Sequence, residues 1–342
     1  MVPSLSTMPA EILDMIFDDI DFVAIQKVRK VCRHLRNHID HFPPDSKLNS
    51  VMMYEYEHRN QMVMKFVMEN NQTLEVKYYD NGKNGCRIFF ENRLKHLDNQ
   101  DFASLIGNDL GLILRNQNSE ATHIRLVFPL SIKLRLSENC LETFHGRFLA
   151  ALVPHLESRR TSIQIKNIEV FEISQESQIM KILRFLDPGC LDSILIRFSK
   201  QRGFSSPTMK INNLIGLEQW KQAKHISIHG LNLASNIENF SHLERMDIEL
   251  KQISGEELVT LRETIIHRPS FFDEFIIYYR HLKDPLPFTS VFGEPRSWEY
   301  TAWFNIPNNN ENALRIRWHP KLKWFVFECR KRMIAAHGTV FN

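Results

Sequence analysis

The sequence predicts an α+β protein, in which a small all-helical N-terminal segment precedes a large α/β domain of alternating strands and helices. Three observations indicate this class. Apolar residues recur every three or four positions over the first forty residues, which is the spacing of one helix face. Beyond residue 120, short strand-like segments recur every 20 to 40 residues. Helix signals lie between those segments, an alternation typical of parallel β–α units.

Length and composition leave the function open. A chain of 342 residues suggests about two domains. The 43 bases and 40 acids nearly balance at +3, which excludes a histone-like or acidic-tail protein. With 43% hydrophobic and 24% charged residues, the chain can bury a globular core.

The cysteines and the N-terminus predict an intracellular, soluble protein. Five cysteines lie far apart without a Cys-x-x-Cys pair, which favours buried thiols over a disulfide framework. The first residues carry no basic leader and hold five acids by Asp21, unlike a signal peptide. Because no stretch of 18 residues lacks charge, we expect no transmembrane helix. The expected location is the cytoplasm, the nucleus or both.

The first forty residues predict a set of short helices. Pro9 and Glu11 are typical of a helix start, and Asp21 is placed to cap a second helix. The first helix has an apolar face, and a second apolar stripe follows it: Ile12, Leu13, Ile16, Phe17 and Ile20, then Val28, Cys32, Leu35 and Ile39. A segment this short is not expected to enclose all these faces alone. Either the rest of the chain covers them or another protein does.

The same segment resembles an F-box. The matching positions are Leu5, Met8-Pro9-Ala10-Glu11, Ile12-Leu13, Ile16, Ile20-Asp21, Val28, Val31-Cys32-Arg33, Arg36 and Ile39-Asp40, with Met8 and Leu35 where Leu and Trp are commonest. The resemblance implies that residues 1–46 bind a Skp-family adaptor, which links to a cullin and RING ubiquitin-ligase core. The implied contact residues are Leu5, Met8, Pro9, Ile12, Leu13, Ile16, Ile20, Val28, Val31 and Cys32.

Residues 47–119 predict a β-rich linking region that is continuous with the following domain. Three strand-like stretches near 51–56, 62–67 and 74–79 are separated by Asn-rich breaks, and a turn at Asp80-Asn81-Gly82 precedes another near 86–90. An antiparallel meander is expected here.

Residues 120–342 predict a leucine-rich-repeat-like stack. Apolar residues at positions 1, 4 and 6 of a repeating unit give anchors at Ile124, Ile163, Ile194, Ile226, Met246 and Phe275. Helix signals intervene around Gln178–Leu186 and after a capping box at Ser254–Glu257. A conventional α/β sheet is the alternative, because the usual Asn ladder of leucine-rich repeats is missing.

This region also resembles the FTH domain found with nematode F-boxes. The features are Ile182-Leu183, Leu186–Leu191, Leu217–Lys224, His242-Leu243-Glu244, Ile253–Leu258, Phe271-Phe272 and the Trp303 and Trp324 strands, with Gln219–Ala223 the most specific stretch. The likeness covers roughly residues 120–330 and, together with the F-box, it implies the nematode F-box A family. The implied role of the domain is capture of a protein substrate.

The sequence lacks the motifs of the common enzymes, so we expect neither catalysis nor a cofactor. The nearest candidate for a metal site, His34, His38 and His41 with Cys32, is interpreted as solvated helix histidines, and no metal is expected. His225 and His229 lie on a strand, where residues four apart are roughly 13 Å apart and cannot share an ion.

The last thirty residues carry seven bases and one acid, interleaved with aromatic residues. Two closing strands with apolar side chains inward and bases outward are the favoured interpretation. The alternative is a surface for nucleic acid or an acidic partner at Arg315, Arg317, Lys321 and Lys323.

These observations favour a substrate-recruiting adaptor of a Skp–cullin–F-box ubiquitin ligase, with an unknown protein substrate. Two other hypotheses stay open: a nucleic-acid-binding regulator that uses the basic C-terminal strands, and a scaffold that never assembles with a cullin. Neither a membrane nor, on the favoured interpretation, a nucleic acid is an expected partner.

Overall fold

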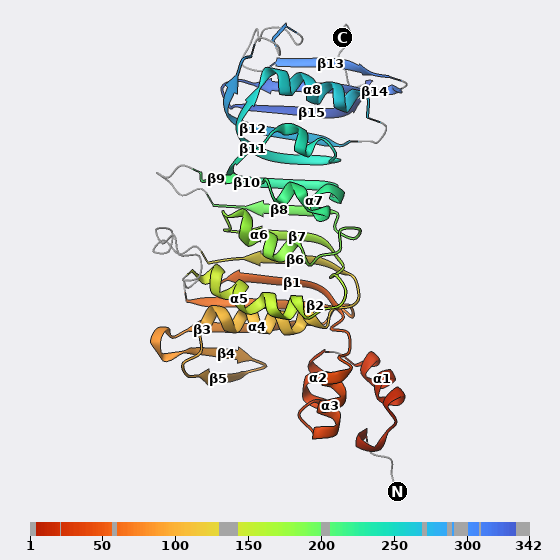
Figure 1. Ribbon diagram of the computed structural model, residues 1–342, viewed down its shortest axis with the longest axis vertical. Helices are drawn as coiled ribbons and strands as arrows, with labels where there is room; N and C mark the ends of the chain where they lie inside the picture. The colour runs from red at the N-terminus through yellow and green to blue at the C-terminus, as the bar shows by residue number, and fades with distance from the viewer. Residues whose placement is uncertain are drawn as a thin grey trace. The chain divides into compact units, whose positions relative to one another are not determined.

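The computed structural model describes residues 5–20, 22–56, 60–129, 143–199, 206–268, 272–285, 289–290, 300–307 and 309–332 (Figure 1). These residues form eight α-helices and fifteen strands, so the predicted mixed class with a helical N-terminus is confirmed. The chain divides into two compact units. Unit 1 is Met1–Ile168 with Lys181–Cys190, and unit 2 is Glu169–Met180 with Leu191–Asn342.

Three helices form the N-terminal part of unit 1: α1 (Ala10–Asp19), α2 (Phe22–Val28) and α3 (Arg33–His41), preceded by the 3-10 helix η1 (Leu5–Thr7). Pro9 is the N-cap of α1, so the helix begins one residue later than its predicted start. The apolar stripe expected over residues 28–39 is interrupted, because the chain turns between α2 and α3. Asp21, the predicted cap of α2, lies outside the described residues.

The predicted meander is confirmed in unit 1. Its antiparallel strands are β1 (Leu48–Glu55), β2 (Gln61–Met68), β3 (Thr73–Asp80), β4 (Cys86–Phe90) and β5 (Arg93–Leu97). A further strand, β6 (Ala121–Val127), pairs in parallel with β1 and places Ile124 beside Val51.

Two helices of unit 1 were not predicted, α4 (Phe102–Arg115) and α5 (Phe144–Glu157). They pack closely, because Gly107 leaves room for the backbone of Phe148: a Cβ on Gly107 would lie 2.3 Å from the carbonyl oxygen of Phe148. The sequence does carry a start signal for α4, since the side chain of Asp101 caps the helix by accepting a hydrogen bond from the Ser104 amide at 2.7 Å.

The predicted repeat anchors fall on strands, except for Ile163, which forms an isolated bridge just before β7. Residues of β7 (Ile165–Phe171) and of α6 (Glu176–Leu183) are divided between the units. Unit 2 holds four strands that run in parallel: β8 (Ser193–Arg197), β10 (His225–Ala234), β11 (Arg245–Ser254) and β12 (Glu274–Lys283). A short strand, β9 (Thr208–Lys210), pairs with β10.

The parallel ladder of unit 2 does not continue to the end of the chain. Strand β12 pairs antiparallel with β15 (Trp324–Lys331), and β15 pairs antiparallel with β14 (Asn309–His319), which pairs antiparallel with β13 (Tyr300–Ile306). The two predicted closing strands are therefore present, whereas a leucine-rich-repeat-like stack stays a prediction.

Short helices accompany the strands of unit 2: α7 (Glu218–Gln222), α8 (Gly255–Ile266), and the 3-10 helices η4 (Leu214–Gly216) and η5 (Ile237–Phe240). The predicted capping box begins α8, since Ser254 and Glu257 each bond the other's backbone amide. Among the described helices, none is long and apolar enough to cross a membrane.

Candidate functional site

The three N-terminal helices enclose a small core of their own. Leu13, Phe17, Ile25, Leu35 and Ile39 are each at most 4% exposed and form one cluster. The expectation that so short a segment could not enclose its apolar faces is therefore only partly right. The helices fold onto each other and bury one set of side chains, and a second set remains outside.

That second set is the largest concentration of uncovered apolar surface in the described chain. Ile12, Met15, Val31 and Phe42 are 42% to 72% exposed. They make up four of the nine large hydrophobic residues that are exposed among the described residues, although they come from fewer than forty positions. Single exposed apolar residues are ordinary, so what sets this segment apart is that it leaves four of them exposed within about thirty positions.

The ten predicted adaptor contacts fall into three groups. Leu13 is fully buried in the helical core, where it supports α1 and presents no surface. Six residues pack half-buried around this core: Leu5, Met8, Ile16, Ile20, Val28 and Cys32. Pro9, Ile12 and Val31 are exposed.

Two further apolar residues that the sequence prediction did not name, Met15 and Phe42, are also exposed. Met15 lies three residues after Ile12, so both side chains occupy one face of α1. That spacing could have identified Met15 as part of the exposed face. Phe42 follows the last residue of α3, where no helical periodicity applies.

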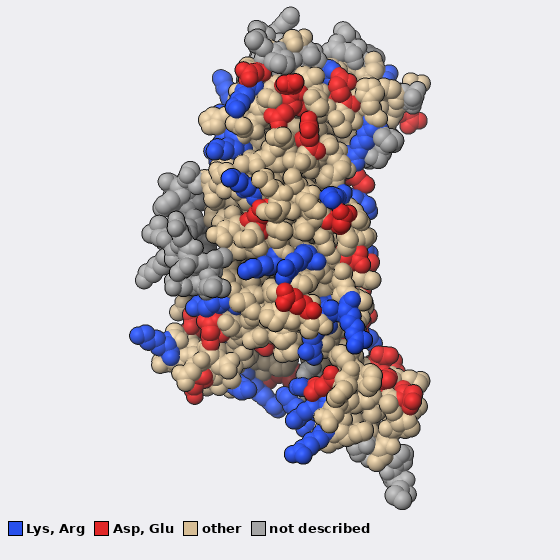
Figure 2. Space-filling model, viewed as in Figure 1, with Lys and Arg blue, Asp and Glu red and all other residues tan. Residues whose placement is uncertain are grey.

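Polar contacts hold the three helices in place. Arg29, after α2, binds Asp40 of α3 through two donors, Nε at 2.7 Å and Nη2 at 3.1 Å. The hydrogen bond from Arg29 lowers the pKa of Asp40 below its ordinary value. His38 of α3 lies 2.7 Å from the carboxylate of Asp14 on α1. Figure 2 shows the surface over these helices as a largely uncharged area bordered by acidic and basic side chains.

Two of the three candidate histidines, His38 and His41, have separate partners. His38 contacts Asp14, and Nδ1 of His41 lies 2.7 Å from the carbonyl oxygen of Asn37. Across the residues that the structure describes, no three His, Cys, Asp or Glu side chains are grouped to hold a metal ion.

The stretch that carries the FTH likeness most specifically is part of the core of unit 2. Trp220 is 1% exposed, packs edge-on against Phe240 and donates its indole N–H to the carbonyl oxygen of Asn239 at 3.3 Å. His242 lies 3.0 Å from the Trp220 carbonyl oxygen, and burial lowers the pKa of this imidazole. Trp220 therefore stabilises the fold and offers no binding surface.

The basic residues of the C-terminal strands converge on one acid. Glu328 of β15 is fully buried and accepts hydrogen bonds from Arg315 at 2.7 Å, Arg317 at 2.8 Å and Arg330 at 2.5 Å. Burial opposes the charge of Glu328, but the arginines outweigh it and hold the carboxyl pKa below its ordinary value. Arg315 and Arg317 are thus occupied within the sheet.

The remaining two candidate cations, Lys321 and Lys323, lie in the turn between β14 and β15. The ammonium group of Lys323 donates to the carbonyl oxygen of Arg280 at 3.1 Å. Most of the interleaved aromatic residues are in the core: Trp318 is 6% exposed, and Phe325 and Phe327 are fully buried. Buried rings cannot stack on nucleotide bases, so this arrangement is that of closing strands.

Comparison with known proteins places these elements in two known domains. The F-box domain family matches residues 5–47, and the FTH domain family matches residues 146–296. The N-terminal helices are therefore similar to the F-box family, and residues 146–296 are similar to the FTH family. The resemblance to the nematode F-box A family that the sequence predicted is confirmed.

The chain is also similar to a curated protein. F-box A protein 224 of Caenorhabditis elegans is 21% identical over 347 aligned positions, which cover 97% of this chain and 78% of the relative. No solved structure matches the chain significantly.

Proposed function

We propose that this protein is a substrate-recognition adaptor of a Skp–cullin–F-box ubiquitin ligase. In this proposal the F-box binds a Skp-family adaptor, and the C-terminal domain captures a protein substrate. The protein itself is not a catalyst. It holds the substrate near a ubiquitin-charged enzyme, so its contribution is proximity and orientation.

The observation that carries this proposal is the number of large apolar side chains that the F-box segment leaves exposed: Ile12, Met15, Val31 and Phe42. Burying a large apolar side chain completely stabilises a complex by about 1.5–3 kcal/mol relative to leaving it in water. Several such residues on helices that already have a folded core suit the binding of an apolar helix face in a partner groove.

Substrate capture is proposed for the larger domain because this domain is similar to the FTH domain. The FTH match covers residues 146–296, and we keep residues 120–342 as the proposed extent of the substrate domain, with leucine-rich-repeat-like units as its proposed architecture. Residues 47–119 are the proposed link between this domain and the F-box, residues 1–46. The cytoplasm, the nucleus or both are the proposed compartments, since the ubiquitin-ligase core works there.

The first experiment measures the affinity of the full chain for a purified Skp-family adaptor. Truncating Ile12→Ala together with Val31→Ala removes two exposed anchors without touching the helical core. We expect a combined loss of about 2 kcal/mol or more, which is roughly 30-fold in Kd.

A matched control separates this effect from a general loss of surface hydrophobicity. Leu94→Ala with Leu322→Ala removes two side chains of comparable exposure, 51% and 63%, outside the F-box. This control should bind as tightly as the wild type. Undiminished binding by the Ile12 and Val31 variant, in a sample whose circular dichroism matches the wild type, contradicts the proposal.

A further inference from the structure

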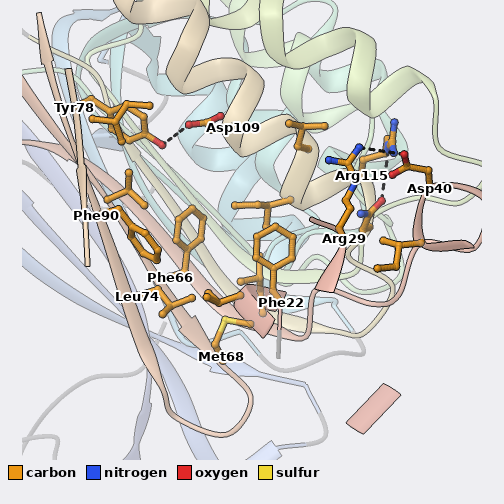
Figure 3. A pocket seen from close by; sticks show the side chains of 18 residues that line it. Phe22, Arg29, Asp40, Phe66, Met68, Leu74, Tyr78, Phe90, Asp109 and Arg115 are labelled. Carbon is orange, nitrogen blue, oxygen red and sulfur yellow. Dashed lines mark hydrogen bonds and ion pairs between the residues drawn. The ribbon is translucent and has the colours of Figure 1, made fainter. Parts of the chain in front are cut away.

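A cavity of about 460 Å³ opens within unit 1, between one face of the meander and α4 (Figure 3). Strands β2, β3 and β4 supply its apolar floor through Phe66, Met68, Leu74, Val76, Ile88 and Phe90. Alternate residues of a strand point to the same face, and the register places Phe66 beside Leu74, so these side chains form one continuous surface.

The opposite wall comes from α4 and the F-box helices. Leu112 of α4 lines the cavity and remains 45% exposed, while Phe22 and Ile39 close one side. Leu74 and Phe90 on the floor are also only half-buried. Apolar side chains on facing walls that remain open to solvent indicate space for an apolar occupant, because a cavity of this size and lining is typical of a small-molecule site.

One end of the cavity is polar, and its two polar side chains are hydrogen-bonded to each other. Figure 3 shows Tyr78 and Asp109 together at this end, and the Tyr78 hydroxyl donates to Asp109 at 2.8 Å. Burial raises the pKa of both groups. This end therefore disfavours a second negative charge beside Asp109.

The other end is basic. Arg29, Asp40 and Arg115 gather there, and Arg29 occupies Asp40 through two hydrogen bonds. The guanidinium of Arg115 forms no ion pair with a carboxylate of the described residues, and the one hydrogen bond it donates there is a long contact of 3.5 Å to the side-chain oxygen of Asn116. A guanidinium in this state can bind an external carboxylate through two parallel hydrogen bonds.

We propose that this cavity binds a medium-chain alkyl carboxylate, with its carboxylate on Arg115 and its chain along Phe66, Leu74 and Phe90. At about 30 Å³ for each water-sized atom, the cavity holds roughly fifteen non-hydrogen atoms, which corresponds to an acid of twelve to fourteen carbons. This site is independent of the proposed adaptor function.

The experiment is a calorimetric titration of the full chain with dodecanoate below its micellar concentration. Dodecyltrimethylammonium, which has the same chain and the opposite charge, tests the head group. Arg115→Gln removes the proposed anion contact. Leu74→Trp fills the cavity, because Leu74 is only half-buried and the larger ring can extend into the open space. Leu322→Ala, outside the cavity, is the control.

We expect dodecanoate to bind the wild type and the Leu322→Ala control equally, and to bind Arg115→Gln at least about tenfold more weakly, as for a lost charge-assisted hydrogen bond. Leu74→Trp should weaken binding to a similar or greater extent, and the cationic probe should bind the wild type more weakly than dodecanoate. The proposal is overturned if the folded wild type does not bind dodecanoate, if both probes bind alike, or if neither cavity variant lowers the affinity. Adaptor binding, measured separately, does not bear on these outcomes.

Discussion

Gly230 sits where strand β10 passes closest to the end of β8. Its φ of +76° lies in the left-handed region, and a Cβ at this position would lie 1.7 Å from the carbonyl oxygen of Phe198. The register between β10 and β11 also shifts just after Ile228. Only glycine fits both the backbone conformation and this close approach.

Replacing Gly230→Ala should therefore destabilise unit 2 by at least about 2 kcal/mol, because the substitution combines strain with a clash against backbone. Urea unfolding followed by fluorescence measures the change. Gly216→Ala is the matched control, since a Cβ there meets nothing within 4 Å, and it should change stability by no more than about 0.5 kcal/mol. Equal effects of the two substitutions are incompatible with this account of Gly230.

Trp220 shows what a sequence motif can and cannot predict about a single residue. The stretch Gln219–Ala223 indicated the FTH domain correctly. Its tryptophan, Trp220, is nevertheless buried against Phe240. A specific motif indicates a family. Whether its side chains bind a partner or pack in the core depends on their burial, which a local sequence pattern does not determine.

At the scale of elements, the C-terminal strands are held together by a buried charge cluster. Glu328 of β15 receives three arginines, two of which come from β14. Removing one partner from a buried ionic cluster leaves like charges close together, which costs about 3–5 kcal/mol. The cluster takes up Arg315 and Arg317, two of the four cations that the sequence offered as a possible nucleic-acid surface.

Glu328→Gln should accordingly destabilise unit 2 at neutral pH, whereas Glu311→Gln, an exposed acid on β14, should have little effect. The pKa of Glu328 is lower in the folded chain than its ordinary value. Its contribution is therefore present above the unfolded pKa, about 4.3, and is lost as the pH falls through the lower folded value. The difference in unfolding free energy between wild type and Glu328→Gln should shrink as the pH drops below about 4. A difference that stays constant from pH 7 to pH 3 contradicts this role.

The strands were more predictable than the helices. Anchors such as Ile194, Ile226 and Met246 lie on buried parallel strands, where alternation and burial coincide. Helices α4 and α5 escaped prediction, although Asp101 caps α4. The apolar face of α4 is interrupted by Gly107 and Gly111, which weaken a helix on propensity alone. In the structure they allow α5 to pack closely against α4.

At the scale of the whole molecule, the net charge of +3 is a sum over segments whose charged residues have different roles. The acid-rich first helix and the basic segment after it leave several apolar side chains exposed, whereas three of the seven C-terminal bases pair with the buried Glu328. The location of the candidate site was predictable from the F-box pattern. Which of its residues are exposed was not predictable. The packing of the three helices buries Leu13 and leaves Met15 exposed.

The central claim is that the F-box helices are the surface on which a Skp-family adaptor binds. Hydrogen exchange of the full chain, with and without saturating adaptor, tests it most directly. We expect adaptor to slow exchange in α1 and in the turn that contains Val31, and to leave strands β8 to β12 of unit 2 unchanged. Unchanged exchange throughout residues 5–42 at saturation, or protection confined to unit 2, would contradict the claim.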